Sequence, residues 1–174
     1  PATFMLKKFL AYIAEQQLFD VEDTVLLAVS GGMDSVAMMH LFFKAKLKFG
    51  VAHCNFGLRG QESDEDEAFV RKLAKKYKAP FYCEHFDTQA FAEKEKLSVQ
   101  MAARLLRYEW FEKIRQQEKY AYLATAHHLN DTLETVLYNV VRGTGISGLH
   151  GILPRQQHVV RPLLFANKED IYDY

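Results

Sequence analysis

Segments with strand character alternate with helical segments four times along this chain, and this alternation limits the possible folds more than any other feature. The expected strands are Thr24 to Ser30, Leu47 to Cys54, Phe81 to Phe86 and Tyr120 to Ala126. The expected helices are Phe4 to Leu18, Met33 to Ala45, Ser63 to Tyr77, Ser98 to Glu118 and Asn130 to Arg142. A continuously apolar run such as Val25 to Val29 is typical of a parallel strand buried on both faces. We therefore predict an α/β domain with a doubly wound, mostly parallel sheet, helices on both faces and a binding site beyond the carboxyl ends of the strands.

Shorter signals refine this outline. Ser63, with Asp66 three residues later, forms a capping-box-like pair that predicts the start of the third helix. Four glycines between residues 143 and 151 predict a loop. Val159 and Val160 could then form a short strand, and Asn167 could cap a further helix that reaches the last residue.

The composition limits the setting in which the chain works. With 174 residues, 49% of them hydrophobic, it can build one sizeable core, so we expect a single domain over residues 1 to 174. No apolar run approaches the roughly 20 residues of a membrane span and no signal peptide is evident, which favours a cytoplasmic protein without a membrane partner. Cys54 and Cys83 form no C-x-x-C pair, so neither a zinc ribbon nor a disulfide framework is expected. The formal net charge is zero, so any nucleic-acid contact requires a local patch, such as the acid-free stretch between Thr135 and Lys168.

The hinge SGGMDS, residues 30 to 35, joins the first strand to the following helix. Such a turn presents free backbone N–H groups at a helix N-terminus, and glycine lets oxygen atoms approach closely, so the hinge favours phosphate binding. Ser30 and Ser35 can add hydroxyl donors, whereas Asp34 repels an anion unless it binds magnesium or braces the loop. A tight turn that needs two glycines for purely structural reasons is the alternative. Neither the Walker pattern G-x-x-x-x-G-K-[ST] nor G-x-G-x-x-G occurs.

The hinge resembles the S-G-G-x-D-S signature of the PP-loop ATP pyrophosphatases. This resemblance implies an adenine nucleotide alpha hydrolase-like fold, cleavage of ATP between the α and β phosphates, and activation of a substrate by adenylation. It implies that the hinge holds the leaving pyrophosphate, with adenine against the backbone near Ala28 and Val29, and that Asp34 is the candidate Mg²⁺ ligand. The residues expected to bind ATP are Ala28, Ser30, Gly31, Gly32, Met33, Asp34 and Ser35.

The second strand ends in AHCNFGLRG, residues 52 to 60, which offers His53, Asn55 and Arg59 at the edge where the fold puts its site. A loop held by Asn55 beside a solvated arginine is the equally weighted alternative. The stretch resembles the H-x-N-x-x-L-R-G segment of the tRNA(Ile)-lysidine synthetases. Those enzymes convert the wobble cytidine of a CAU anticodon to lysidine.

MAARLLRYEWF, residues 101 to 111, resembles the A-A-R-x-L-R-Y helix of the same family. Arg104 and Arg107 are three residues apart, so they share a helix face and could bind phosphate or RNA. A solvated face is the alternative. Ala103, Leu106 and Trp110 form an apolar stripe, and we expect Trp110 and Met101 to lie in the core.

Residues 124 to 152 resemble the family's T-A-H-H-x-x-D-x-x-E-T helix and the R-G-[TS]-G-x-x-G-L loop after it. Asp131 and Glu134 share one face of the helix, with Leu133, Leu137 and Val140 largely on the other, which predicts a packed apolar face. A metal site of His127, His128 and Asp131 is the weaker alternative, because adjacent histidines point apart. Asn130 and Thr132 stand where the family commonly has an acidic residue and often a glutamine.

The family resemblance implies a two-step reaction. The carbonyl oxygen on carbon 2 of the cytidine attacks the α-phosphorus of ATP and releases pyrophosphate, and the amine of L-lysine then displaces AMP at that carbon. The implied cofactors are ATP and Mg²⁺, and the implied partner is tRNA(Ile) with a CAU anticodon. Asp34, Arg107, Asp131 and Glu134 would be catalytic, with Arg104 or Arg107 near the α-phosphate, and Asp131 and Glu134 would recognise lysine. The substrate contacts would include His53, Asn55, Arg59, His127 and Arg142.

Two rival functions are weaker. A tRNA thiolase of the same superfamily would be expected to use catalytic or cluster-binding cysteines, and no C-x-x-C is present. A non-catalytic ATP-binding module would not need the carboxylates and arginines of the downstream motifs. The family usually carries further C-terminal domains that grip the tRNA, so we expect this chain to be a part of a longer protein. A homodimer is one possible oligomeric state.

Overall fold

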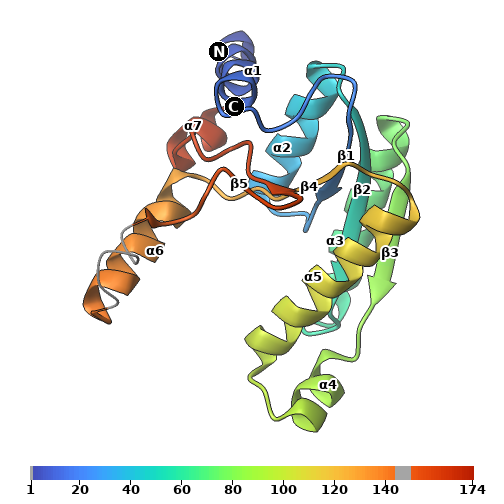
Figure 1. Cartoon of the computed structure of the whole chain (residues 1–174). Helices are drawn as coiled ribbons and strands as arrows, with labels where there is room; N and C mark the ends of the chain where they lie inside the picture. The colour runs from blue at the N-terminus through green and yellow to red at the C-terminus, as the bar shows by residue number, and fades with distance from the viewer. Residues whose placement is uncertain (1, 144–149) are drawn as a thin grey trace.

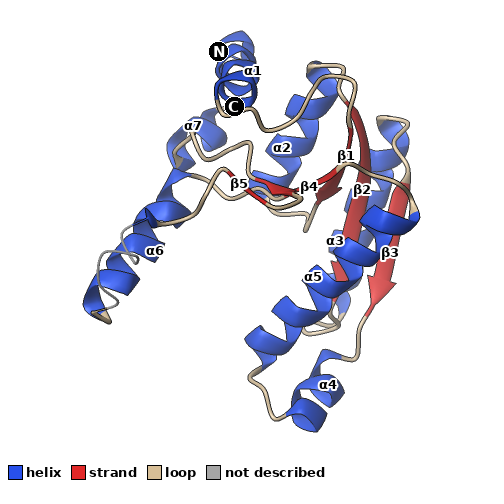
Figure 2. Ribbon diagram, in the orientation of Figure 1, coloured by secondary structure: helices blue, strands red, loops and turns tan. Residues whose placement is uncertain are grey.

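A sheet of six strands forms the centre of the described part of the chain, which in this computed structural model comprises residues 2–143 and 150–174 (Figure 1, Figure 2). The strand order is β3-β2-β1-β4-β6-β5, and every neighbouring pair is parallel except β5 and β6. The doubly wound, mostly parallel sheet predicted from the sequence is confirmed. The strands are β1 Thr24–Ala28, β2 Lys48–Asn55, β3 Phe81–His85, β4 Tyr122–Ala124, β5 Arg155–Gln156 and β6 Val159–Val160.

Helices cover both faces of this sheet (Figure 2). The predicted helices are present with shifted ends, and the short helix α4 was not expected. Asn167 caps α7 as predicted, because its side chain accepts a hydrogen bond from the Asp170 N–H at 2.7 Å. The helices are α1 Ala2–Glu15, α2 Met33–Lys44, α3 Gln61–Lys76, α4 Thr88–Glu95, α5 Val99–Gln117, α6 Leu129–Val141 and α7 Lys168–Asp173.

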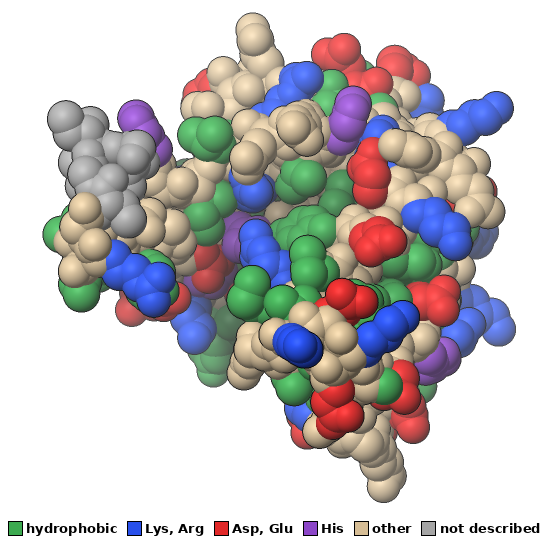
Figure 3. Space-filling model, turned by 60° about the horizontal axis from the view of Figure 1, so that its bottom comes forward, with side chains coloured by type: hydrophobic (Ala, Val, Ile, Leu, Met, Phe, Trp, Pro, Cys, Tyr) green, Lys and Arg blue, Asp and Glu red, His purple; other side chains and the backbone are tan. Residues whose placement is uncertain are grey.

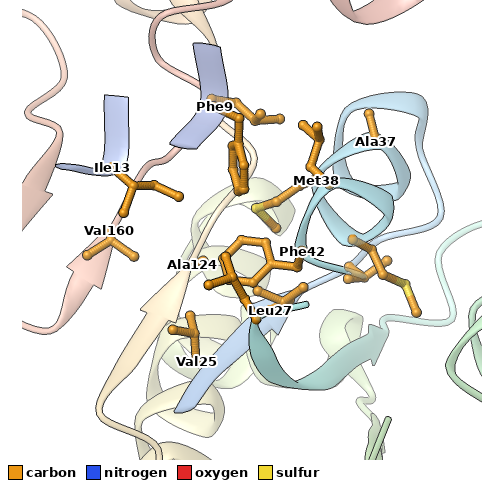
Figure 4. Close-up of a cluster of buried hydrophobic side chains, with 14 of the residues drawn as sticks. Phe9, Ile13, Val25, Leu27, Ala37, Met38, Phe42, Ala124 and Val160 are labelled. Carbon is orange, nitrogen blue, oxygen red and sulfur yellow. The ribbon is translucent and has the colours of Figure 1, made fainter. Parts of the chain in front are cut away.

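The core is divided between the two faces of the sheet because successive strand residues point to opposite sides. Val25 and Leu27 of β1 pack into the larger cluster, which contains buried residues of α1, α2, α3 and α7 (Figure 4). Leu26, between them, joins the smaller cluster on the other face with Trp110 and Phe111 of α5. Burial on both faces explains the unbroken apolar run of β1, since each such side chain contributes about 1.5–3 kcal/mol when it leaves water.

The direction in which successive strands are added to the sheet reverses beside β1. From β1 the chain builds β2 and β3 on one side, and it then returns to place β4 on the other side of β1. The loops after β1 and β4 therefore diverge from neighbouring strand ends. In open α/β sheets this switch point is where ligands bind.

Three local predictions were wrong. Helix α3 begins at Gln61 with Gly60 before it, and Ser63 instead accepts a hydrogen bond from the Arg59 N–H at 3.2 Å. Trp110 is buried as expected, but Met101 is 57% exposed. Helix α6 has no buried residue and extends away from the sheet in Figure 1, so its expected apolar face is not packed against the described residues.

Part of the predicted glycine-rich loop, including Gly145 and Gly148, lies outside the described residues. Within residues 2–143 and 150–174, no helix combines the length and apolar character that crossing a membrane requires.

Candidate functional site

The hinge between β1 and α2 is a turn braced by its two serines. The Ser35 hydroxyl accepts a hydrogen bond from the Ser30 N–H at 3.2 Å and donates one to the Gly32 carbonyl at 3.0 Å. The Ser30 hydroxyl in turn accepts from the Gly32 N–H at 3.2 Å. No side chain caps the N-terminus of α2, so this helix end suits an anion.

Gly31 gives the turn its shape. Its φ of +96° lies in the region that favours glycine. A Cβ added there would lie 3.4 Å from Cβ and Oδ1 of Asp66, so the first part of α3 packs against the turn. The glycine is therefore required by the backbone conformation.

A cavity of about 280 Å³ opens beside this turn at the switch point, and we call it the hinge cavity. Its polar lining includes Ser30, Asp34, Ser35, Arg107, Thr125 and His127. Ala28, Val29, Phe56, Tyr108 and Phe111 supply apolar wall. Figure 3, turned toward this edge of the sheet, shows hydrophobic side chains gathered at the centre of a hollowed face, with Lys or Arg and His side chains beside them. A phosphate turn next to an apolar wall has the character expected of a nucleotide site.

Arg107 supplies the permanent positive charge of the hinge cavity. It comes from α5, and its guanidinium lies 5.2 Å from the ring centroid of Phe56, another lining residue. Stacking on an aromatic face fixes the guanidinium plane while leaving its N–H groups free to bind an anion.

His127 lies on the wall of the hinge cavity, just after β4. Its Nδ1 is 2.8 Å from the Thr125 hydroxyl. Burial, followed by the positive charge of Arg161, lowers the pKa of His127. Its ring is therefore neutral near pH 7 and can act as a hydrogen-bond donor or acceptor toward a ligand.

Asp34 meets the start of α6. Its Oδ2 is 3.3 Å from Nε2 of His128, and the same Nε2 is 3.5 Å from Oδ2 of Asp131. The His128 N–H donates to Asp131 at 2.8 Å. Oδ1 of Asp34 is buried and has no hydrogen-bond partner among the described residues. Asp34 thus braces the turn with one oxygen and keeps the other available for a cation, which fits a Mg²⁺ ion held by one carboxylate and substrate phosphates.

A second pocket of about 530 Å³ adjoins the hinge cavity, and we call it the charged pocket. The two share Tyr108 and His127 as lining residues. The charged pocket lies between α5 and α6 and contains the carboxylates of Asp131 and Glu134 and the guanidiniums of Arg104 and Arg161.

The remaining predicted ATP contacts lie elsewhere. Met33 is 42% exposed and lines a different pocket beside α7. Arg104 lies in the charged pocket, with its guanidinium 5.1 Å from the Tyr108 ring centroid, and does not line the hinge cavity.

His53 and Asn55 are buried within the protein rather than facing a pocket. His53 is 2% exposed, and its Nδ1 donates to the Val29 carbonyl at 2.7 Å. Asn55 donates to Asp64 and Glu67 and accepts from the Gly57 N–H, so it holds the loop after β2. These positions favour a structural role for both side chains.

The two arginines expected among the substrate contacts, Arg59 and Arg142, are exposed. Arg59 forms ion pairs with Glu62 at 2.6 Å and with Asp66 at 2.7 Å, beside the hinge. Arg142, at the end of α6, stacks on Tyr138 at 4.7 Å. Both can reach an external phosphate, Arg59 only by exchanging its acidic partners.

Glu67 is the centre of a polar cluster at the far edge of the sheet. It accepts hydrogen bonds from Asn55, Arg71 and His85. Burial on its own raises the pKa of Glu67, but these hydrogen bonds outweigh it and lower the pKa to about 2. The described residues bring Glu67, Cys83 and His85 together as metal-type ligands, whereas His127, His128 and Asp131 form no such group.

Sequence reasoning missed several cavity residues. Tyr108 and Thr125 stand inside the motifs noted above, so their positions could have been inferred from those motifs. Arg161 lies in the acid-free stretch between Thr135 and Lys168 but in none of the motifs, and only the pairing of β6 with β4 brings it beside His127.

Comparison with known proteins identifies the sequence family. Residues 3–174 match the family described as the PP-loop domain. The chain is 46% identical over 168 residues to the tRNA(Ile)-lysidine synthase of Bacteroides thetaiotaomicron, covering 97% of this chain and 39% of that protein. It is 45% identical over 172 residues to the tRNA(Ile)-lysidine synthase of Chlorobaculum tepidum, covering 97% of this chain and 52% of that one. The chain therefore spans about half or less of the length of these relatives.

Solved structures share the fold. The U34-tRNA thiolase NcsA from Methanococcus maripaludis superposes with a TM-score of 0.75 at 20% identity, over 97% of this chain and 61% of that one. The NH3-dependent NAD synthetase from Campylobacter jejuni superposes with a TM-score of 0.64 at 16% identity, over 98% of this chain and 70% of that one. At these identities the likeness concerns the fold alone.

Proposed function

We propose that this chain, which belongs to the PP-loop domain family, is the ATP-using domain of a tRNA(Ile)-lysidine synthase. The observation that carries the proposal is the adjacency of two pockets of different chemistry. One contains a phosphate-type turn, the other contains a pair of carboxylates, and Tyr108 and His127 line both. A reaction that joins an ATP-activated base to a cationic amino acid needs this combination.

In the first step the O2 oxygen of the wobble cytidine attacks the α-phosphorus of ATP, and the bond to the bridging oxygen breaks as pyrophosphate leaves. The hinge would hold the pyrophosphate through its backbone N–H groups and the hydroxyl of Ser30. Arg107 would stabilise the charge that develops on the α-phosphate. Asp34 would hold Mg²⁺ through Oδ1, and that ion supplies charge neutralisation at the phosphates.

In the second step the ε-amine of lysine attacks carbon 2 of the cytidine, and AMP leaves with the electron pair of the C–O bond. The amine must lose a proton before it can attack. Asp131 and Glu134 bind the cationic side chain, and a carboxylate or the neutral ring of His127 accepts the proton. The relatives' shared name supports this substrate pair, since lysine and tRNA(Ile) are the partners it implies.

Cys54 lines the hinge cavity, but its properties argue against the thiolase alternative. Burial raises the pKa of Cys54 to about 12. A thiol with a raised pKa is protonated near pH 7 and is a poor nucleophile.

The test is AMP formation by the full-length protein that contains this chain. With ATP, lysine and a CAU-anticodon tRNA(Ile) transcript, we expect AMP release that requires both lysine and tRNA, and a mass gain on the tRNA equal to one lysine less one water. A transcript with uridine at the wobble position should give neither. Glu134→Gln should raise KM for lysine, whereas Glu118→Gln, at the exposed end of α5, should not. Lysine-independent AMP formation, or none at all, would refute the proposal.

A further inference from the structure

The charged pocket contains opposite charges that are not paired with one another. Within residues 2–143 and 150–174, neither Arg104 nor Arg161 forms an ion pair with Asp131 or Glu134. In the described part the carboxylate of Asp131 pairs only with His128, and the Glu134 side chain forms no hydrogen bond or ion pair. Because these charges are not used up in pairing with one another, each sign is available to a ligand. Held apart across one pocket, they match a ligand that carries both signs.

Arg161 is the more desolvated of the two cations. It follows β6, and its backbone N–H donates to the Pro154 carbonyl at 2.8 Å, which fixes the main chain. Nη1 donates to the Leu153 carbonyl at 2.7 Å, so one end of the guanidinium is anchored. Nε is buried and has no hydrogen-bond partner among the described residues. A buried donor left unsatisfied costs about 1–3 kcal/mol, so the guanidinium is short of an acceptor.

Arg104 differs in each of these respects. Its side chain is exposed, it stacks on Tyr108, and it belongs to a helix face open to solvent. An exposed cation is screened by water and binds a small carboxylate weakly. A half-buried arginine with a fixed fork is better suited to a single carboxylate group.

We infer that Arg161 is the carboxylate-binding residue of an amino-acid site in the charged pocket, with Asp131 and Glu134 binding the ammonium group of the ligand's side chain. Under the proposed function, on which this inference rests, the ligand is free L-lysine and Arg161 pairs with its α-carboxylate. The pocket thereby distinguishes an amino acid from a diamine of the same length. Tyr108 and His127, shared with the hinge cavity, form the passage through which the lysine side chain meets the activated base.

The experiment compares lysine with 1,5-diaminopentane, which is lysine without its carboxylate. Both amines are assayed with the full-length protein, ATP and the tRNA transcript. The wild type should use lysine with a KM about 10- to 100-fold below that for the diamine, as expected for one charge-assisted pair. Arg161→Leu should raise KM for lysine by that factor and leave KM for the diamine and for ATP unchanged. Arg161→Lys should recover part of the preference for lysine.

Arg155→Leu is the matched control. Arg155 is an exposed arginine on the neighbouring β5, with its guanidinium 5.0 Å from the Tyr122 ring centroid and outside the charged pocket, so its loss should leave both amines unaffected.

Equal KM values for the two amines in the wild type would overturn the inference while leaving the proposed function standing, and this comparison needs no variant to fold. An equal loss for both amines in Arg161→Leu would show that Arg161 acts on folding or on tRNA, which also overturns it. Failure of the wild type to form AMP with either amine would overturn the proposed function and the amino-acid site together.

Discussion

Replacing Gly31 by alanine tests whether the hinge conformation is what binds ATP. Alanine at a φ of +96° adds backbone strain of about 1–3 kcal/mol. The new Cβ would meet Asp66 at 3.4 Å, an ordinary contact that adds little. The strain is therefore set by the backbone, and it corresponds to about 5- to 150-fold in an equilibrium constant.

This strain is divided between stability and affinity. If the turn keeps its shape, the free energy of unfolding falls by the full amount. If the turn relaxes, stability is recovered, but the chain must be forced back into the binding shape and ATP affinity falls. Because Gly31 is only half-buried and Gly32 is exposed, we expect relaxation and mainly a loss of affinity.

Calorimetry with a non-hydrolysable ATP analogue and Mg²⁺, together with denaturant unfolding, measures both quantities. Their losses should sum to about 1–3 kcal/mol for Gly31→Ala. Gly60→Ala is the control, because Gly60 has a φ of +54° with no atom within 4 Å of an added Cβ and lies outside the hinge cavity. It should lose stability without losing affinity. A Gly31→Ala variant that matches the wild type in both measurements would refute the reasoning.

Other expected outcomes follow from single contacts. Arg107→Ala should lower kcat/KM for AMP formation by about 100- to 1000-fold and Arg107→Lys by less, and equal effects of the two changes would exclude a bidentate role. Gly50→Ala would place a Cβ 2.6 Å from Cζ of the buried Tyr120 and should lower the free energy of unfolding by about 1–3 kcal/mol, so a loss below about 0.5 kcal/mol in denaturant titration would contradict this packing. Because the pKa of Glu67 is lowered, its ionised carboxylate stabilises the fold at pH values above its ordinary pKa of 4.5. This stabilisation is lost as the pH falls toward 2. Glu67→Gln should therefore show a shallower loss of stability over that pH range, and an unchanged slope would refute the assignment.

The sheet could be predicted from the sequence because its central strands are buried on both faces. β1, β2 and β4 appear as mainly apolar runs, whereas the edge strand β3 has no buried residue and ends in the exposed Glu84 and His85. β5 spans two exposed residues, and α4 is a single short helix between β3 and α5, so neither has enough residues for a periodic pattern. The packing of α6 was mispredicted because amphipathic spacing shows that one helix face is apolar but does not show which element, if any, packs against that face.

The sequence predicted the cavity residues that belong to local motifs. It did not predict those whose position depends on where a strand ends or on which strands pair. Asp34 and Arg107 were found through their motifs, and both line the hinge cavity. His53 was expected near the end of the second strand and Asn55 just beyond it, facing the site, but β2 continues to Asn55. Two residues apart on a strand, both side chains point to the same face and are buried there. Arg161 has no local signal, since only the pairing of β6 with β4 brings it to the pocket.

The two oxygens of Asp34 predict separable effects on ATP binding. Oδ2 contacts His128, and the buried Oδ1 has no partner among the described residues. Asp34→Asn removes the charge that would hold Mg²⁺, so the affinity for the ATP analogue should become less dependent on Mg²⁺ concentration. His128→Leu removes the brace but leaves the carboxylate, so affinity should fall at every Mg²⁺ concentration with the same dependence. Because His128 also contacts Asp131, this second change should raise KM for lysine as well. If a Mg²⁺ titration shifts equally in the two variants, Asp34 acts through a single contact and the division of roles between its oxygens is wrong.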